Sequence, residues 1–248
     1  MKFEKKIDPY LEGTSFSNGL IVQIAEGMES AYDRLQIIEN LVAGRSVIHL
    51  GCVDHIPLLD EKIKKNRWLH ARICKTAKRC LGIDINEEGI RYIRDALGYT
   101  DVICADLTIH PLEEILENQW DFLVLGEVLE HIQNPVMFLK KISEYYHNNV
   151  TCLIISVPHA FSYLNITSAF LHKEIINSDH YYWFTPYTLA KIVMAAGMQV
   201  EFFKFCEPFS PLEENPKTIS YPVHIIRHCL TTVFPATHQT LVMVVKLR

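Results

Sequence analysis

The sequence lacks the features that mark secreted, membrane-spanning and zinc-binding proteins. Its seven cysteines include no CxxC pair, a distribution that disfavours both a zinc site and a disulfide framework and is typical of reduced cytosolic thiols. The N-terminal stretch MKFEKKIDPYLEG has no apolar core of the kind that a signal peptide needs, and no apolar run approaches the ~18 residues of a membrane span. We therefore expect a cytoplasmic protein that holds no metal and makes no contact with a membrane.

An excess of positive charge is also missing. Lysine and arginine number 24 against 29 acidic residues, and the net charge of −5 argues against nucleic acid as a partner, because phosphate binding needs clustered cations. The one basic cluster, KIKKNRW at 62–68, fits the solvated face of a helix. The length of 248 residues and the 49% hydrophobic content fit one large α/β domain over residues 1–248.

Short apolar runs alternate with helical patterns along most of the chain. The runs predicted as strands are 46–50, 80–85, 101–105, 121–126, 151–157, 198–205 and 240–247. Helices are predicted over 30–42, over 57–78 with a break near Asn66, around 90–97, from Asn134 and from Thr185. This alternation predicts a doubly wound α/β fold, a mostly parallel sheet with helices on both faces. The last two strands follow each other without a crossover helix, so we expect them to pair antiparallel.

Glycines and polar residues stand at the predicted strand ends, where ligands bind in open α/β sheets. They are Gly51, Cys52 and Asp54; Asp84; Asp106; Gly126, Glu127, Glu130 and His131; and His159. Ionised carboxylates only accept hydrogen bonds, so acids on three successive strand ends suit a ligand with hydroxyl and amino donors, such as a ribose. Capping of the following helix remains the alternative for each acid.

The stretch HLGCVDH, from His49 to His55, is a poor dinucleotide loop. Of the GxGxxG pattern that lets a pyrophosphate approach the backbone, only Gly51 is present, and Val53 and His55 fill the other glycine positions. NAD and FAD are therefore disfavoured, and a ligand without phosphate is favoured.

Six motifs follow one another along the chain: VIHLGC (47–52), GIDI (82–85), ICADL (103–107), DFLVLGEVLEHIQNP (121–135), LIISVPH (153–159) and DHYYWFTPYTL (179–189). In this order and at these spacings they resemble the class I S-adenosylmethionine-dependent methyltransferases. The resemblance implies a Rossmann-like sheet of seven strands with the last strand antiparallel, and S-adenosyl-L-methionine as cofactor. The cofactor-binding residues it implies are Gly51, Cys52, Asp54, Asp84, Ile85, Asp106, Leu107, Gly126 and Glu127.

Roles follow from the same resemblance. The loop at Gly51 would hold the methionine moiety, Asp84 the ribose hydroxyls, Asp106 and Leu107 the adenine, and Glu127 would border the methyl group and the acceptor. The first motif departs from the usual DxGCGxG, because His49 stands at the leading acid. We hypothesise that Asp54 replaces that acid from the far side of the loop.

Histidines are the candidates for a general base, because imidazole titrates near neutral pH. His131, His159 and His180 lie in the motifs that the resemblance puts near the acceptor, although capping or core packing is the alternative for each. The string EVLEH lacks the first histidine of the HxxEH zinc-peptidase motif, which argues against a metalloprotease. Ser156 lacks a GxSxG elbow, which argues against a nucleophilic serine.

The acceptor is expected to be a small molecule or a carbohydrate, methylated at oxygen. Residues 1–44 are expected to form a helical cap over the cofactor site, and the proline-rich insertion 207–238 to lie near the acceptor or in a subunit contact of a possible homo-oligomer. A protein of this fold that binds the cofactor or a partner without catalysis remains the alternative.

Overall fold

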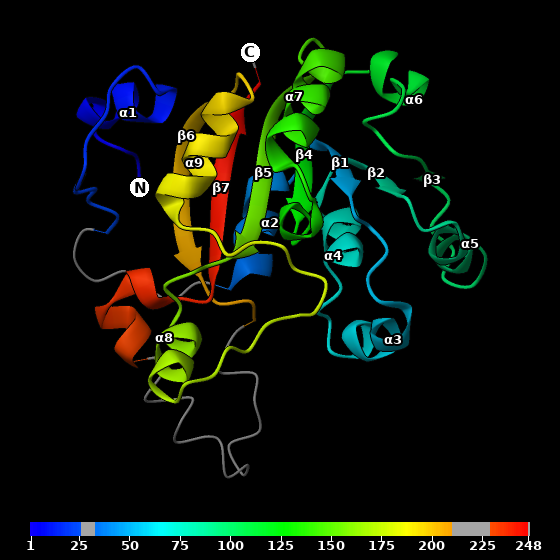
Figure 1. Ribbon diagram of the computed structural model, residues 1–248. Coiled ribbons are helices and arrows are strands. Elements are labelled where there is room, and N and C mark those ends of the chain that lie inside the picture. The colour runs from blue at the N-terminus through cyan, green and yellow to red at the C-terminus, as the bar shows by residue number, and fades with distance from the viewer. Residues whose placement is uncertain (26–32, 210–228, 248) are drawn as a thin grey trace.

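A computed structural model describes residues 1–25, 33–209 and 229–247, whose strands form one mixed sheet in the order β3-β2-β1-β4-β5-β7-β6 (Figure 1). The strands are β1 (Ser46–Leu50), β2 (Arg79–Asp84), β3 (Val102–Cys104), β4 (Trp120–Gly126), β5 (Val150–Pro158), β6 (Gln199–Cys206) and β7 (Thr240–Lys246). Neighbouring strands pair parallel except at β7, which runs antiparallel to both β5 and β6. The doubly wound fold, the seven strands and the antiparallel last strand are thus confirmed.

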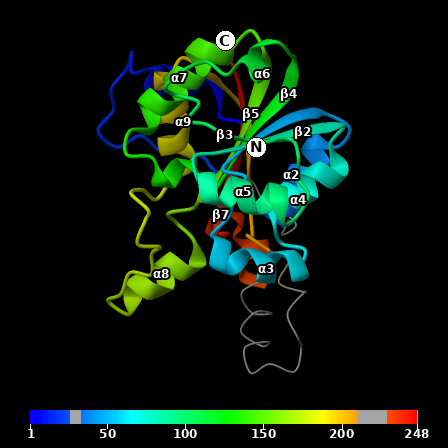
Figure 2. The ribbon, with the colours of Figure 1, turned by 90° about the vertical axis from the view of Figure 1, so that its right-hand side faces the viewer.

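Helices cover both faces of the sheet, which Figure 2 shows edge-on. The α-helices are α1 (Asp8–Glu12), α2 (Arg34–Val42), α3 (Ile56–Lys64), α4 (Leu69–Thr76), α5 (Glu87–Asp95), α6 (Glu113–Leu116), α7 (Pro135–Tyr146), α8 (Tyr163–Phe170) and α9 (Pro186–Ala195). Short 3-10 turns are η1 (Lys5–Ile7), η2 (Leu129–His131) and η4 (Pro235–Thr237). Within the described residues, no helix combines the length and the apolar character that a membrane crossing requires.

Two apolar cores lie on opposite faces of the sheet. Alternate strand residues point to opposite faces, so Ile48 packs with α7 and α9 while Val47 packs with α2 and α4. The central strands β4 and β5 have buried apolar side chains on both faces, as expected for strands covered by helices on both sides. This arrangement leaves the carboxyl ends of the strands as the open edge of the sheet.

Local signals in the sequence set several helix boundaries. Asn134 caps α7 by accepting a hydrogen bond from the Met137 amide at 3.1 Å, and Thr185 forms a capping box at the start of α9. Asn66 has a left-handed φ of +52° between α3 and α4, so the predicted break in the helix over 57–78 is confirmed.

Other boundaries differ from those expected. The helix α8 was not predicted; Ser162 caps it by accepting from the Asn165 amide at 3.2 Å. The predicted start of a helix at residue 30 and most of the insertion 207–238 lie outside the described residues. Within the described part, residues 229–233 are helical and precede η4.

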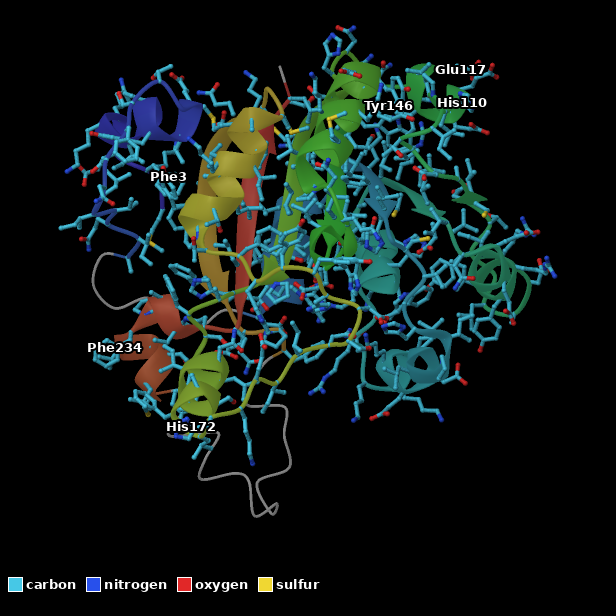
Figure 3. The ribbon with its side chains drawn as sticks, in the orientation of Figure 1. Phe3, His110, Glu117, Tyr146, His172 and Phe234 are labelled. Atoms are coloured by element: carbon cyan, nitrogen blue, oxygen red, sulfur yellow. The ribbon has the colours of Figure 1, made fainter. Side chains whose placement is uncertain are left out.

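The N-terminal segment packs on the far edge of the sheet rather than over its carboxyl ends. The Phe3 and Phe203 rings lie 5.0 Å apart, and α1 packs on α9. Figure 3 labels Phe3 in this N-terminal segment, to the left of the sheet. Burial of Ile7 and Leu11 in the α7–α9 core holds this segment there. The expected cap by residues 1–44 is therefore wrong for residues 1–25.

Candidate functional site

A cleft of about 1130 Å³ opens at the carboxyl ends of β1 to β4. The strand order reverses between β1 and β4, and such a reversal is where open α/β sheets bind ligands. Every residue predicted to bind the cofactor lines this cleft: Gly51, Cys52, Asp54, Asp84, Ile85, Asp106, Leu107, Gly126 and Glu127. Two of the three predicted histidines, His131 and His180, also line it.

The loop after β1 approaches the cleft through a glycine that no other residue could replace without strain. Gly51 has a left-handed φ of +77°, and a Cβ placed there would lie 2.6 Å from Val128 Cγ2. The amides of Gly51 and Cys52 both donate to the Ile83 carbonyl, at 2.8 and 3.2 Å, which ties the loop to the end of β2. The single glycine of HLGCVDH is thus the one that this turn needs.

Asp84 at the end of β2 links the two neighbouring loops. Its Oδ2 accepts from the Val53 amide at 2.9 Å and its Oδ1 from the Asn86 amide at 3.0 Å. Helix α5 is capped by Asn86 instead, which accepts from the Gly89 amide at 2.9 Å, so Asp84 is not the cap. Burial raises the pKa of Asp84, and these backbone hydrogen bonds oppose the rise. Each carboxylate oxygen keeps a further lone pair with which to accept from a ligand.

The next two strand ends differ in polarity. Ile85 lines the cleft with 74% of its surface exposed, although it follows a buried strand, and so offers an apolar wall to a planar ligand. Asp106 is exposed, and its Oδ1 accepts from both the Thr108 amide at 2.8 Å and the Thr108 hydroxyl at 2.7 Å. Asp106 therefore closes a local turn, and Leu107 beside it is buried.

The floor of the cleft is Gly126, around which three side chains meet. A Cβ at Gly126 would lie 2.5 Å from Leu69 Cδ2 and 3.7 Å from both Arg34 Nη1 and His49 Nε2. Glu127 follows with a left-handed φ of +59°, unusual for a residue with a side chain, and its Oε1 lies 3.6 Å from Arg34 Nη1. Arg34 Nη1 also donates to Ser156 Oγ at 3.2 Å.

Arg34 is a site residue that the sequence patterns missed. It is the first residue of α2, it is buried, and of the described residues before Gly44 it alone lines the cleft. Its partner Ser156 is 122 residues away in sequence. The local sequence signal for Arg34 is its place directly after Asp33, the N-cap of α2. The Asp33 side chain accepts a hydrogen bond from the Leu35 amide at 2.7 Å.

His49, which stands where the resembling enzymes carry an acid, is buried against α4. Its Nδ1 lies 3.2 Å from His70 Nδ1, and its Nε2 is buried without a hydrogen-bond partner among the described residues. Burial, and then the nearby His70 and Arg34, lower the pKa of His49 well below its usual value. A neutral imidazole with one nitrogen turned to the cleft floor therefore replaces a carboxylate.

Asp54 lines the cleft on the side of α3 and already has partners there. Its carboxylate forms an ion pair with Lys62 and accepts from the His55 amide at 2.7 Å. Our hypothesis that Asp54 takes the place of the lost acid stays a prediction, with Lys62 as its competitor.

Glu130, His131 and His180 form a cluster on the rim of the cleft. Each offers a ligand atom, and the three atoms lie within 4.8 Å of one another. Both carboxyl oxygens of Glu130 are buried without a hydrogen-bond partner among the described residues, and burial beside Glu127 raises the pKa of Glu130 to about 9. The rings of His131 and His180 meet edge to face at 4.7 Å. Such a set could move a proton or hold a divalent cation.

A segment far along the chain brings His180 to this cluster. The segment between α8 and α9 runs across the carboxyl ends of the central strands (Figure 1). The Tyr181 amide donates to the Glu130 carbonyl at 2.8 Å, which fixes the segment against η2. His180 thus reaches the Glu130–His131 turn from about 50 residues further along the chain.

The structure does not bring His159 to the cleft. The chain stays extended for one residue beyond β5, where His159 bridges to Phe184 and its amide donates to the Gln239 carbonyl at 2.8 Å. The ring points into the core, 4.8 Å from the Phe205 ring, and burial lowers the pKa of His159 to about 4. The expectation that His159 borders the acceptor is therefore wrong, and the alternative of core packing holds.

The cleft fits S-adenosylmethionine by its own chemistry. Gly51 leaves space that a Cβ would fill, Asp84 offers acceptors for hydroxyl groups, and Ile85 exposes an apolar wall. At the floor, Arg34 and His49 supply polar nitrogens beside Gly126, where a carboxylate would be stabilised. The fold and the site define an α/β protein with a ligand cleft at the point where its strand order reverses.

Comparison with known proteins identifies that class further. The chain matches the model of a family of methyltransferase domains over residues 25–201, more than half of its length, and belongs to that family. A relative of known sequence, N-methyltransferase 4 of Papaver somniferum, is 34% identical over 96 residues, which cover 38% of this chain. That match spans 24%, about a quarter, of the plant protein.

Solved structures share the fold. A S-adenosylmethionine-dependent methyltransferase from Archaeoglobus fulgidus aligns over 86% of this chain and 91% of its own, with a TM-score of 0.51 and 18% identity. The small RNA methyltransferase HEN1 aligns over 91% of this chain and 27% of its own, with a TM-score of 0.55 and 14% identity. The chain therefore carries a methyltransferase domain, in the fold that these solved methyltransferases share.

Proposed function

We propose that the protein methylates a hydroxyl group of a small molecule or glycan. The observation that carries the proposal is the cluster of Glu130, His131 and His180 on the rim of the cleft, a set of proton-handling groups without an evident structural task. When bound, S-adenosylmethionine supplies an activated methyl group. The cofactor would lie along Gly51, Asp84 and Gly126, on the cleft wall that leads to this cluster.

A hydroxyl acceptor needs the chemistry that this cluster offers. An alcohol is a weak nucleophile until its proton is taken, whereas an amine attacks through a free lone pair. Burial, with His131 beside it, lowers the pKa of His180, which keeps its imidazole neutral and able to accept a proton at neutral pH. Glu130 offers a carboxyl oxygen within 4.8 Å of a nitrogen of each ring, and the imidazolium that results would favour the ionised form of this carboxyl.

The same three groups suit a divalent cation. A bound cation would satisfy the buried Glu130 oxygens and lower the pKa of a hydroxyl that it ligates. Cation dependence is therefore part of the test, because a metal and an imidazole base activate the same acceptor in distinguishable ways.

The size and charge of the protein favour a small acceptor. A net charge of −5 disfavours nucleic acid, which is the substrate class named for HEN1. The second candidate is methylation at nitrogen, which the name of the Papaver somniferum relative motivates. A nitrogen acceptor would need no base, and the Glu130 cluster would then have no effect on the chemical step.

The test has two stages. Titration calorimetry with S-adenosylmethionine and S-adenosylhomocysteine measures cofactor binding, and release of S-adenosylhomocysteine from panels of sugars, phenols and amines measures turnover. We expect binding of both compounds and turnover on hydroxyl acceptors only, reduced at least about 100-fold in Glu130→Gln and His180→Gln. Turnover measured after chelation with EDTA, and again after Mg²⁺ is added back, distinguishes activation of the acceptor by a cation from activation by an imidazole base.

Three results would contradict the proposal. Turnover on amines that is insensitive to Glu130→Gln would establish the nitrogen candidate. Cofactor binding without turnover on any acceptor would favour a sensor or scaffold. Failure of both compounds to bind would remove the methyltransferase function itself.

A further inference from the structure

A second cluster of metal-binding side chains lies beneath the sheet, behind the cleft. His70 and Cys74 stand one turn apart on α4, and Cys80 is the second residue of β2. One ligand atom from each of the three lies within 4.8 Å of the others. The thiols are free, because none of the cysteines in the described residues forms a disulfide.

The separations are close to those of atoms that share one ion. His70 Nδ1 lies 3.9 Å from Cys80 Sγ and 4.0 Å from Cys74 Sγ, and His49 Nδ1 lies 3.2 Å from His70 Nδ1. Around a tetrahedral Zn²⁺, with Zn–N near 2.0 Å and Zn–S near 2.3 Å, ligand atoms lie roughly 3.3–3.8 Å apart. His70, Cys74 and Cys80, whose ligand atoms lie within 4.8 Å of one another, would draw together by up to about 1 Å to reach that geometry, and His49, which contacts His70, would move toward them as well.

The surroundings make room for this set. Gly82 lies beside His49 in the β1–β2 pairing, and a Cβ at Gly82 would lie 2.7 Å from His70 Cε1 and 3.0 Å from Cys52 Sγ. His70 and Cys80 are buried, while Cys74 is half-buried and leaves a route to solvent. Two imidazoles in contact, with two thiols beside one of them, form a poor apolar core, but they offer the nitrogen and thiolate ligands that Zn²⁺ prefers.

We propose that His70, Cys74 and Cys80 bind a thiophilic cation such as Zn²⁺, with His49 as the fourth ligand. Binding forms two metal–thiolate and two metal–imidazole bonds and releases the two thiol protons to solvent. Ligation through His49 Nδ1 leaves the proton on Nε2, which faces the cleft floor beside Gly126. The ion would thus hold His49 as a fixed donor to the cofactor cleft, in the position where resembling enzymes carry an acid.

The test is reconstitution of the full chain with Co²⁺ after chelation. We expect thiolate-to-cobalt charge-transfer absorption, intense tetrahedral ligand-field bands, and displacement of Co²⁺ by about one equivalent of Zn²⁺. The double variant Cys74→Ser/Cys80→Ser should lose the charge-transfer band, while the control Cys104→Ser, an exposed thiol, should keep it. Glu130→Gln should also keep it, which separates this site from the rim cluster.

The proposal can still be tested if the double variant fails to fold, because two measurements use the wild-type chain alone. Zn²⁺ should protect two thiols from a chromogenic thiol reagent and raise the midpoint of thermal unfolding, whereas Mg²⁺ should do neither. Absence of a charge-transfer band in the wild-type chain would overturn the proposal. A band that survives in a folded double variant, or thiol protection explained by a Cys74–Cys80 disulfide, would overturn it equally.

Discussion

Replacing Gly51 by alanine probes the cofactor loop directly. The φ of +77° costs a residue with a side chain about 1–2 kcal/mol. In addition, the new Cβ would meet Val128 Cγ2 at 2.6 Å, so the loop or Val128 must move by about 1 Å to reach ordinary contact. Val128 borders the cleft immediately before η2, so that movement reaches the cofactor site.

The matched control is Gly44→Ala. Gly44 has nearly the same φ, +70°, but a Cβ there has nothing within 4 Å. We expect both variants to lose about 1–2 kcal/mol in urea unfolding, from backbone strain alone, with a further loss only in Gly51→Ala.

Calorimetry with S-adenosylhomocysteine should separate the two variants. Gly51→Ala should raise the Kd at least about tenfold, which corresponds to ~1.4 kcal/mol, and Gly44→Ala should leave it unchanged. Unchanged affinity in Gly51→Ala, or an equal loss in both variants, would refute the assignment of this loop.

Three further predictions follow from the charges of the fold. Asp84→Asn should weaken S-adenosylhomocysteine binding roughly 10–100-fold, while the cap-conserving control Asn86→Asp should not; equal Kd values would contradict the role of Asp84. The pKa of Glu130, raised from 4.5 to about 9, keeps this carboxyl protonated in the folded protein at pH values where it ionises in the unfolded chain. Between these two pH values the free energy of unfolding should fall by up to about 1.4 kcal/mol per pH unit. Glu130→Gln should flatten this pH profile, measured by urea unfolding. The pKa of His159, lowered to about 4, has the opposite sign: stability should fall as pH drops from 6.5 towards 4, and His159→Leu should show a shallower loss, whereas an unchanged slope would place the ring in solvent.

Much of the fold could be predicted from local signals. Apolar runs bounded by glycine or acid predict the strands, and Asn134-Pro135 and Thr185-Pro186 predict helix starts that the structure confirms. Helix α8 escaped prediction because its apolar side chains form no buried stripe: Leu164 and Phe170 are both exposed, so burial does not impose a helical period on the sequence.

The site could be predicted only where it depends on strand ends. Parallel strands bring their carboxyl ends together, which is why Asp84 and Glu127 line one cleft although they lie far apart in sequence. Arg34 reaches the cleft floor because α2 packs on the face of the sheet opposite to α7 and α9. No residue spacing in the sequence predicts that packing. The error at His159 has a similar origin, because one additional extended residue turns the ring into the core.

The cysteines show a third limit. The absence of a CxxC pair disfavours a zinc site, whereas the site proposed above takes His70 and Cys74 from one helix face and Cys80 from the adjoining strand. The spacing HxxxC is a usable signal on a helix, but its third member depends on the tertiary fold.

The central claim is that the cleft at the carboxyl ends of β1 to β4 binds S-adenosylmethionine. A crystal structure with S-adenosylhomocysteine tests it most directly. We predict ribose hydroxyls donating to Asp84, the adenine against Ile85, and the amino-acid carboxylate near Arg34 and His49. Product bound elsewhere on the protein, or a cleft left empty at saturating concentration, would contradict the account.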